Sequence, residues 1–127
     1  MMEAAHRRLA FAERLLGELD GIDPERAPTS AIHTGYYAMF HAATAVIIAA
    51  GEDPPQTHSG VIARFSRLVI QRSLPTDQSV AVLGRAQAAR QLADYDEAAR
   101  GLETKAHDVL QQSPTFVAFC RRMISGS

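Results

Sequence analysis

The chain has 127 residues with a formal net charge of −1, and 46% of its residues are hydrophobic. That hydrophobic content excludes a disordered chain, and the near-zero charge excludes both a global basic surface for nucleic acid and an acidic tail. A lone cysteine, Cys120, excludes an internal disulfide and a cysteine-based metal site and fits a reducing compartment. The N-terminus lacks the apolar segment of a signal peptide, and the longest apolar stretch, residues 42–50, is too short to span a bilayer. We therefore expect one cytoplasmic domain over residues 1–127, without a membrane segment.

Hydrophobic periodicity predicts helices along the whole chain, because apolar residues recur at spacings of three and four. The first helix is predicted over Met2–Leu19 and is ended by the Gly- and Pro-containing residues 21–28. The second is expected to begin near Thr29 or Ser30, either of which can act as its N-cap, and to stop at Gly51.

The third helix is predicted to begin at His58 with Thr57 as its N-cap. Residues 73–76 read as a turn, in which Thr76 caps a fourth helix that runs from Asp77 to about Arg100.

The fifth helix is expected to begin near Leu102 and to be interrupted at Pro114, since proline cannot donate the helical hydrogen bond. Ser113 would then cap a new C-terminal helix. Short connections between all these segments predict an all-α fold, an antiparallel up-and-down bundle of four to five helices.

The same spacing rule predicts two polar seams, each a stripe of polar residues along one face of a helix. The first lies on the second helix, where polar residues recur at spacings of four, three, four and three on one stripe: Ser30, Thr34, Tyr37, His41 and Thr44. The second lies on the fourth helix, with spacings of three, four and three: Gln87, Arg90, Asp94 and Glu97, with Tyr95 beside it.

Each seam has an ordinary explanation and a functional one. Arg90 and Asp94 form an i,i+4 pair that stabilises a helix slightly, and a polar stripe is usually a solvated face. The functional interpretation is that both seams line one cleft or one self-association surface. A guanidinium binds phosphate bidentately and an imidazole moves protons near neutral pH, so the seams could hold a nucleotide or an RNA backbone. The candidate ligand-binding residues are Tyr37, His41, Arg90, Asp94 and Tyr95.

The histidines do not predict a metal site, because none of the five stands at a metal-ligand spacing and no His-Glu-x-x-His motif is present. A Gly-rich phosphate loop is also missing from the sequence. We therefore expect neither a metal nor a cofactor.

Three ordered motifs resemble the small stand-alone branch of the HEPN-domain family. They are Tyr36-Tyr37-Ala38-Met39-Phe40-His41-Ala42-Ala43, then His58-Ser59-Gly60-Val61 followed by Phe65, and Arg90-Gln91-Leu92-Ala93-Asp94-Tyr95. The resemblance is close over residues 30–95. It implies a helical bundle that pairs as a homodimer, and a partnership with a minimal nucleotidyltransferase in a toxin–antitoxin-like pair.

Several HEPN branches are metal-independent ribonucleases whose motif is an arginine followed four to six residues later by a histidine. Here no histidine follows Arg90 within the next seven residues. His41 or His58 could replace it only if the fold brings one of them near Arg90. The resemblance therefore does not favour an enzyme.

Three hypotheses follow. The first is a homodimeric binding module that engages a nucleotidyltransferase and binds a nucleotide or RNA. The second is a ribonuclease toxin in which Arg90 binds the scissile phosphate and His41 or His58 acts as general base. The third is a purely structural bundle in which Arg90, Asp94 and Tyr95 form a buried network that fixes the helix register.

Overall fold

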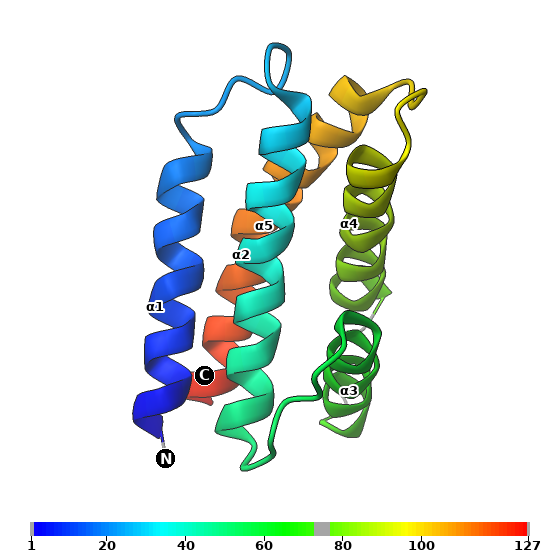
Figure 1. Cartoon of the computed structure of the whole chain (residues 1–127). Coiled ribbons are helices and arrows are strands. Elements are labelled where there is room, and N and C mark those ends of the chain that lie inside the picture. The colour runs from blue at the N-terminus through cyan, green and yellow to red at the C-terminus, as the bar shows by residue number, and fades with distance from the viewer. Residues whose placement is uncertain (1, 73–76, 127) are drawn as a thin grey trace.

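The computed structural model describes residues 2–72 and 77–126, and its ordered elements there are five helices: α1 (Met2–Leu19), α2 (Pro28–Ala49), α3 (His58–Gln71), α4 (Asp77–Tyr95) and α5 (Leu102–Ser125). Figure 1 shows α1, α2, α4 and α5 running alternately up and down, with the shorter α3 below α4. The predicted all-α antiparallel bundle is confirmed. None of the helices in the described part of the chain is both long enough and apolar enough to cross a membrane.

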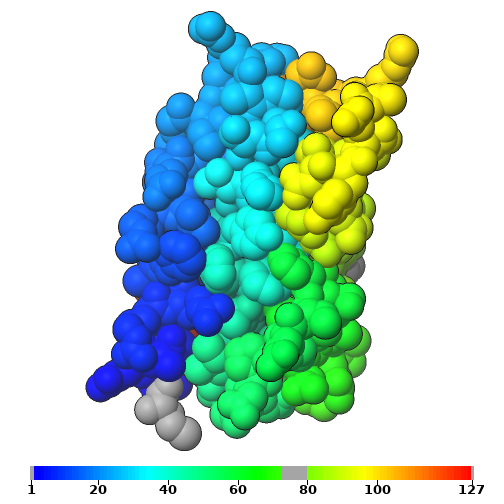
Figure 2. All heavy atoms as spheres, in the orientation of Figure 1, coloured from blue at the N-terminus to red at the C-terminus, as the bar shows by residue number. Residues whose placement is uncertain are grey.

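Helix α2 is the centre of the bundle, because each of the other four helices packs against it. It is rich in alanine and is buried over most of its circumference, so neighbouring helices approach it closely. Its remaining face reaches the surface between α1 and α4, as the space-filling view shows (Figure 2). This open face of α2 carries the first polar seam.

Both ends of α2 differ slightly from the prediction. The helix begins at Pro28, whose fixed φ suits the first helical position, and Ala27 occupies the N-cap position without a side-chain hydrogen bond. Thr29 and Ser30 therefore lie inside the first turn and do not cap the helix. At the other end the helix stops at Ala49, and Gly51 adopts a left-handed φ of 83°, which glycine tolerates best.

Helix α3 begins where the sequence predicted. The Thr57 side chain accepts a hydrogen bond of 3.0 Å from the backbone N–H of Gly60, so the predicted N-cap is confirmed. The predicted turn at residues 73–76, with Thr76 as a cap, lies outside the described residues.

The prediction that α4 extends to about Arg100 is wrong, since the helix ends at Tyr95. The Asp96 carboxylate accepts a hydrogen bond from the backbone N–H of Ala98 at 3.0 Å, and its carbonyl accepts one from Ala99 at 3.1 Å. Aspartate can bind its own backbone in this way and so favours a turn over continued helix. Glu97, the last residue of the second seam, is therefore outside the helix.

The predicted interruption at Pro114 is also wrong, because α5 continues through it. Proline leaves the carbonyl of Leu110 without its helical donor, but its ring lies on the exposed side of the helix. The opposite side is buried on both sides of the proline, at Val109, Phe116 and Val117. Burial of this apolar face against α2 keeps the helix continuous despite the missing hydrogen bond, so Ser113 caps no new helix.

Candidate functional site

The Arg90 side chain is held within its own helix. Its Nε donates to Oε1 of Gln87 at 3.1 Å and its Nη1 donates to Oδ2 of Asp94 at 3.0 Å. Only 9% of the side chain is exposed. The guanidinium also lies over the ring of Tyr36, 5.3 Å from its centroid, in a cation–π contact. The predicted Arg90–Asp94 ion pair is therefore present, and Arg90 also contacts α2 through the Tyr36 ring.

Burial lowers the pKa of Arg90, but hydrogen bonding to Tyr95, together with Tyr36, Tyr37 and the Asp94 carboxylate, raises it by more. Arg90 therefore carries its charge at any relevant pH. Tyr95 itself is 78% exposed at the end of α4. The predicted site residues Arg90, Asp94 and Tyr95 thus form one group, with Tyr95 at the surface.

Tyr36 connects Arg90 to His58. Its hydroxyl lies 2.7 Å from Nδ1 of His58, and the two rings stack with centroids 5.7 Å apart. Burial raises the pKa of Tyr36 far above its usual value, so the hydroxyl stays protonated. The pKa of His58 is lowered, first by burial and then by the charge of Arg90, which favours the neutral imidazole.

The fold therefore brings His58, and not His41, into the group around Arg90. Tyr36 was not predicted as a site residue, because its spacing from Phe40, Ala43 and Ile47 places it on the apolar face of α2. Tyr36 is fully buried, so that placement is correct, but its hydroxyl reaches a polar partner. Buried tyrosines usually find such a partner, and this is the signal that could have identified it.

His41 lies on the other side of the open face, against α1. Its ring centroid is 4.6 Å from that of Phe11, and its Nδ1 is 3.4 Å from Nη1 of Arg8. Burial, the charge of Arg8 and then His58 lower its pKa to about 4. No contact joins His41 to Arg90 among the described residues, so the structure does not place it as the missing histidine of a nuclease pair.

Tyr37 lies between these two groups. Its ring centroid is 5.1 Å from Tyr36, 5.8 Å from His58 and 6.1 Å from His41. The first seam is thus lined by a continuous cluster of rings that runs from α1 across α2 to α3, and Tyr37 is its middle member.

A contact between α2 and the second seam on α4 was not predicted. Nε2 of His33, on α2, lies 3.3 Å from Oδ2 of Asp94, on α4. His33 stands four residues before Tyr37, so its helical spacing places it on the same face. The Asp94 carboxylate therefore contacts both His33 and Arg90, and the two seams meet at this point.

Thr44 does not belong to the first seam, contrary to the prediction. It is 2% exposed, and its hydroxyl donates to the carbonyl of Phe40 at 2.8 Å, a bond to its own helix. Its polar atom is satisfied inside the core and is unavailable to a ligand.

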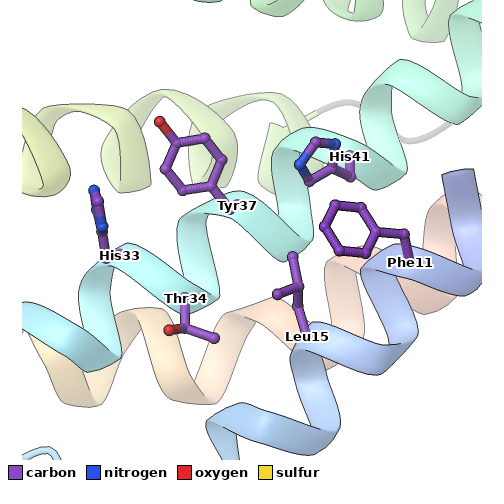
Figure 3. A pocket seen from close by; sticks show the side chains of 6 residues that line it. All are labelled: Phe11, Leu15, His33, Thr34, Tyr37 and His41. Atoms are coloured by element: carbon purple, nitrogen blue, oxygen red, sulfur yellow. The ribbon is translucent and has the colours of Figure 1, made fainter.

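A shallow pocket of about 300 Å³ opens on the face between α1 and α2, beside the ring cluster (Figure 3). Phe11 and Leu15 come from α1, and the α2 side is lined by His33, Thr34, Tyr37 and His41. Within residues 2–72 and 77–126, no three acidic, histidine or cysteine side chains lie close enough together to bind a metal ion.

A search of curated proteins gives no match to the chain. The family model of the HEPN domain matches residues 2–123, nearly the whole length. The resemblance that rested on three motifs therefore extends to all five helices. This chain belongs to the HEPN-domain family.

Proposed function

We propose that the chain is a HEPN binding module of the cytoplasm. In this proposal it pairs with a second copy of itself, engages a minimal nucleotidyltransferase in a toxin–antitoxin-like pair, and binds a nucleotide or RNA at the meeting point of the two seams. The observation that carries the preference for binding over catalysis is the state of Arg90. Its side chain is 9% exposed, and its guanidinium already donates to Gln87 and Asp94.

Arginine commonly binds a phosphate through two parallel N–H groups. Here the Asp94 carboxylate occupies Nη1, and a phosphate approaching the same guanidinium would meet that negative charge. A nucleotide could instead bind at the surface beside Arg90, through Tyr37, Tyr95 and the edge of the guanidinium. Such binding needs less rearrangement of the Arg90 side chain than binding of a transition state does.

Melting experiments test the binding function. A ligand that binds the folded state raises its stability by mass action, by about 2.7 kcal/mol at a ligand concentration one hundred times Kd. We expect nucleotides or a short RNA to raise the melting temperature of the wild-type protein and to lose this effect in Arg90→Ala. Arg85→Ala is the matched control, because Arg85 lies on the same helix but pairs with Asp108 at 3.1 Å, away from the seams.

Sedimentation of the purified chain and co-purification with a co-expressed nucleotidyltransferase test the pairing. A monomer that binds no such partner, and whose melting is unaffected by any nucleotide or RNA, would contradict the proposal. The third hypothesis would then hold, in which Arg90, Asp94 and Tyr95 serve only the packing of helices.

One observation favours a ribonuclease as a second candidate. His58 and Arg90 both contact Tyr36, so an imidazole and a guanidinium share one partner even though no histidine follows Arg90 in the sequence. In this alternative Arg90 binds the phosphate, and His58, neutral near pH 7, takes a proton as general base.

RNA cleavage in the presence of a chelator separates the two candidates. A ribonuclease would cut RNA in the wild type and lose activity in both Arg90→Ala and His58→Ala. It would keep its activity in Arg85→Ala and in His107→Ala. His107 is an exposed histidine that contacts Glu25. The binding module predicts no cutting above the background of Arg90→Ala, with circular dichroism to show that each variant is folded.

A further inference from the structure

The pocket between α1 and α2 has the composition of a small-ligand site. Its walls are formed by the apolar side chains of Phe11 and Leu15 on one side and by the ring of Tyr37 on the other. Figure 3 shows Phe11 and Leu15 reaching from α1 toward α2, with the ring of His41 next to Phe11, while the Tyr37 ring extends away from α1. A volume of about 300 Å³ is at the lower end for small-molecule sites, which suits one flat ring with one substituent.

One hydroxyl group in this pocket is available to a ligand. The Thr34 hydroxyl has no hydrogen-bond partner among the residues that the structure describes. Thr44, by contrast, bonds back to its own helix. An apolar pocket that also offers a few free polar groups is the usual form of a specific binding site.

An arginine without a counter-ion among the described residues lies next to the pocket, in contact with His41. Arg8 is partly buried beside His41 and has no carboxylate within ion-pair distance in the described part of the chain. Its neighbour Arg7 is exposed and pairs with Glu3 at 3.9 Å. Arg8 therefore brings an uncompensated positive charge to the His41 end of the pocket.

Arg8 also fixes the hydrogen-bonding state of His41. A guanidinium can only donate, so Nδ1 of His41 must accept from Arg8 across the 3.4 Å contact. The proton of the neutral imidazole then resides on Nε2, which becomes an N–H donor. Burial and the Arg8 charge lower the pKa of His41 to about 4, so this neutral form persists near pH 7. The pair presents N–H donors and a positive charge, which together favour an anionic group.

We propose that the α1–α2 pocket binds a small aromatic anion, with its ring between Phe11, Leu15 and Tyr37 and its carboxylate or phosphate group against Arg8 and His41. The site shares Tyr37 with the proposed function but does not use Arg90, so it goes beyond that function, and Arg90→Ala distinguishes the failure of one from the failure of the other. The apolar walls match a flat ring, and an arginine without a counter-ion among the described residues matches a single negative charge.

Titration of the full-length ¹⁵N-labelled chain, followed by amide chemical shifts, tests the site. Phenyl phosphate, benzoate and adenosine monophosphate are the aromatic anions, benzyl alcohol is the neutral ring, and inorganic phosphate is the anion without a ring. We expect saturable shifts centred on residues 8–15 and 33–41 for at least one aromatic anion. Benzyl alcohol and inorganic phosphate should each bind about tenfold more weakly or worse, because each lacks one of the two interactions. The tightest of the three anions identifies a carboxylate, a phosphate or a nucleotide as the natural group.

The variants locate the charge contact. Arg8→Gln should weaken binding about tenfold, which is the loss of one charge-assisted hydrogen bond. Arg7→Gln is the matched control and should bind as the wild type does. Arg90→Ala should also leave the binding of phenyl phosphate and benzoate unchanged, which separates this site from the Arg90 group. The proposal is overturned if no aromatic anion saturates in the millimolar range, or if benzyl alcohol binds equally well. It is also overturned if Arg8→Gln matches Arg7→Gln, or if the same amides shift with protein concentration alone, because a second copy would then occupy the face.

Discussion

Gly35 is the position where a single methyl group should have the largest effect on this bundle. It lies in the middle of α2 on the side that faces α5. A Cβ built there would lie inside van der Waals distance of Cγ1 of Val109, with Leu19 Cδ2 at 3.5 Å and Ser113 Oγ at 3.7 Å. Val109 is buried and β-branched, so its side chain has little freedom to turn away. An alanine at this position must therefore push α2 and α5 apart.

Two opposing terms set the size of the effect. Replacing glycine by alanine inside a helix ordinarily stabilises it by about 0.5–1 kcal/mol. Overpacking a well-filled core costs about 1–3 kcal/mol. We expect Gly35→Ala to lower the free energy of unfolding by about 1–2 kcal/mol, since the steric term exceeds the gain in helix propensity.

Urea unfolding followed by far-ultraviolet circular dichroism measures this difference. Gly17→Ala is the matched control, because Gly17 is also inside a helix but a Cβ there would meet nothing within 4 Å. It should stabilise the protein by about 0.5–1 kcal/mol. If both substitutions stabilise the protein equally, the close approach of α2 and α5 at Gly35 does not exist and the reasoning is refuted.

Three further predictions concern named side chains. Burial in the folded protein lowers the pKa of His41 to about 4 from the usual 6.5 of histidine, so the unfolded chain binds more protons between these two values. The unfolding free energy should therefore fall as the pH decreases from 7 to 4. For a half-buried group we expect about 1–2 kcal/mol of this loss, and His41→Gln should flatten the slope in urea unfolding across that range. Tyr36→Phe should cost about 1 kcal/mol in the same assay, because the 2.7 Å hydrogen bond to His58 is lost, and should alter the ¹⁵N tautomer signals of that histidine. Pro114→Ala should raise the unfolding free energy by about 1–2 kcal/mol, since it restores the N–H that pairs with the Leu110 carbonyl; an unchanged midpoint would contradict this.

The ring cluster gives the open face of α2 two chemically different halves. Toward α4, the Asp94 carboxylate contacts both His33 and Arg90, so the positive charge of that half is compensated. Toward α1, Arg8 has no such partner in the described part of the chain. This difference is why the two halves are assigned different ligands, a nucleotide or RNA at the rim of Arg90 and a small aromatic anion between α1 and α2.

Hydrophobic periodicity was enough to predict the helices and their antiparallel packing, because the burial of each helix follows from spacings that are visible in a single chain. The N-cap at Thr57 and the Arg90–Asp94 pair were also predictable, since each depends on residues three or four apart. The errors at Arg100 and Pro114 arose where local rules compete with other forces. Asp96 forms a turn in a segment whose sequence otherwise favours helix. Burial against α2 keeps α5 continuous through Pro114.

The candidate site was only half determined by the sequence. The residue types and seams were visible, but the contacts that define their chemistry join residues far apart in the chain: Tyr36 with His58, His33 with Asp94, and Arg8 with His41. These pairs depend on how helices rotate and approach in the packed bundle, which no spacing rule within one helix can fix. The tertiary structure therefore decided that His58, rather than His41, joins Arg90, and that Arg8 has no counter-ion among the described residues beside an open pocket.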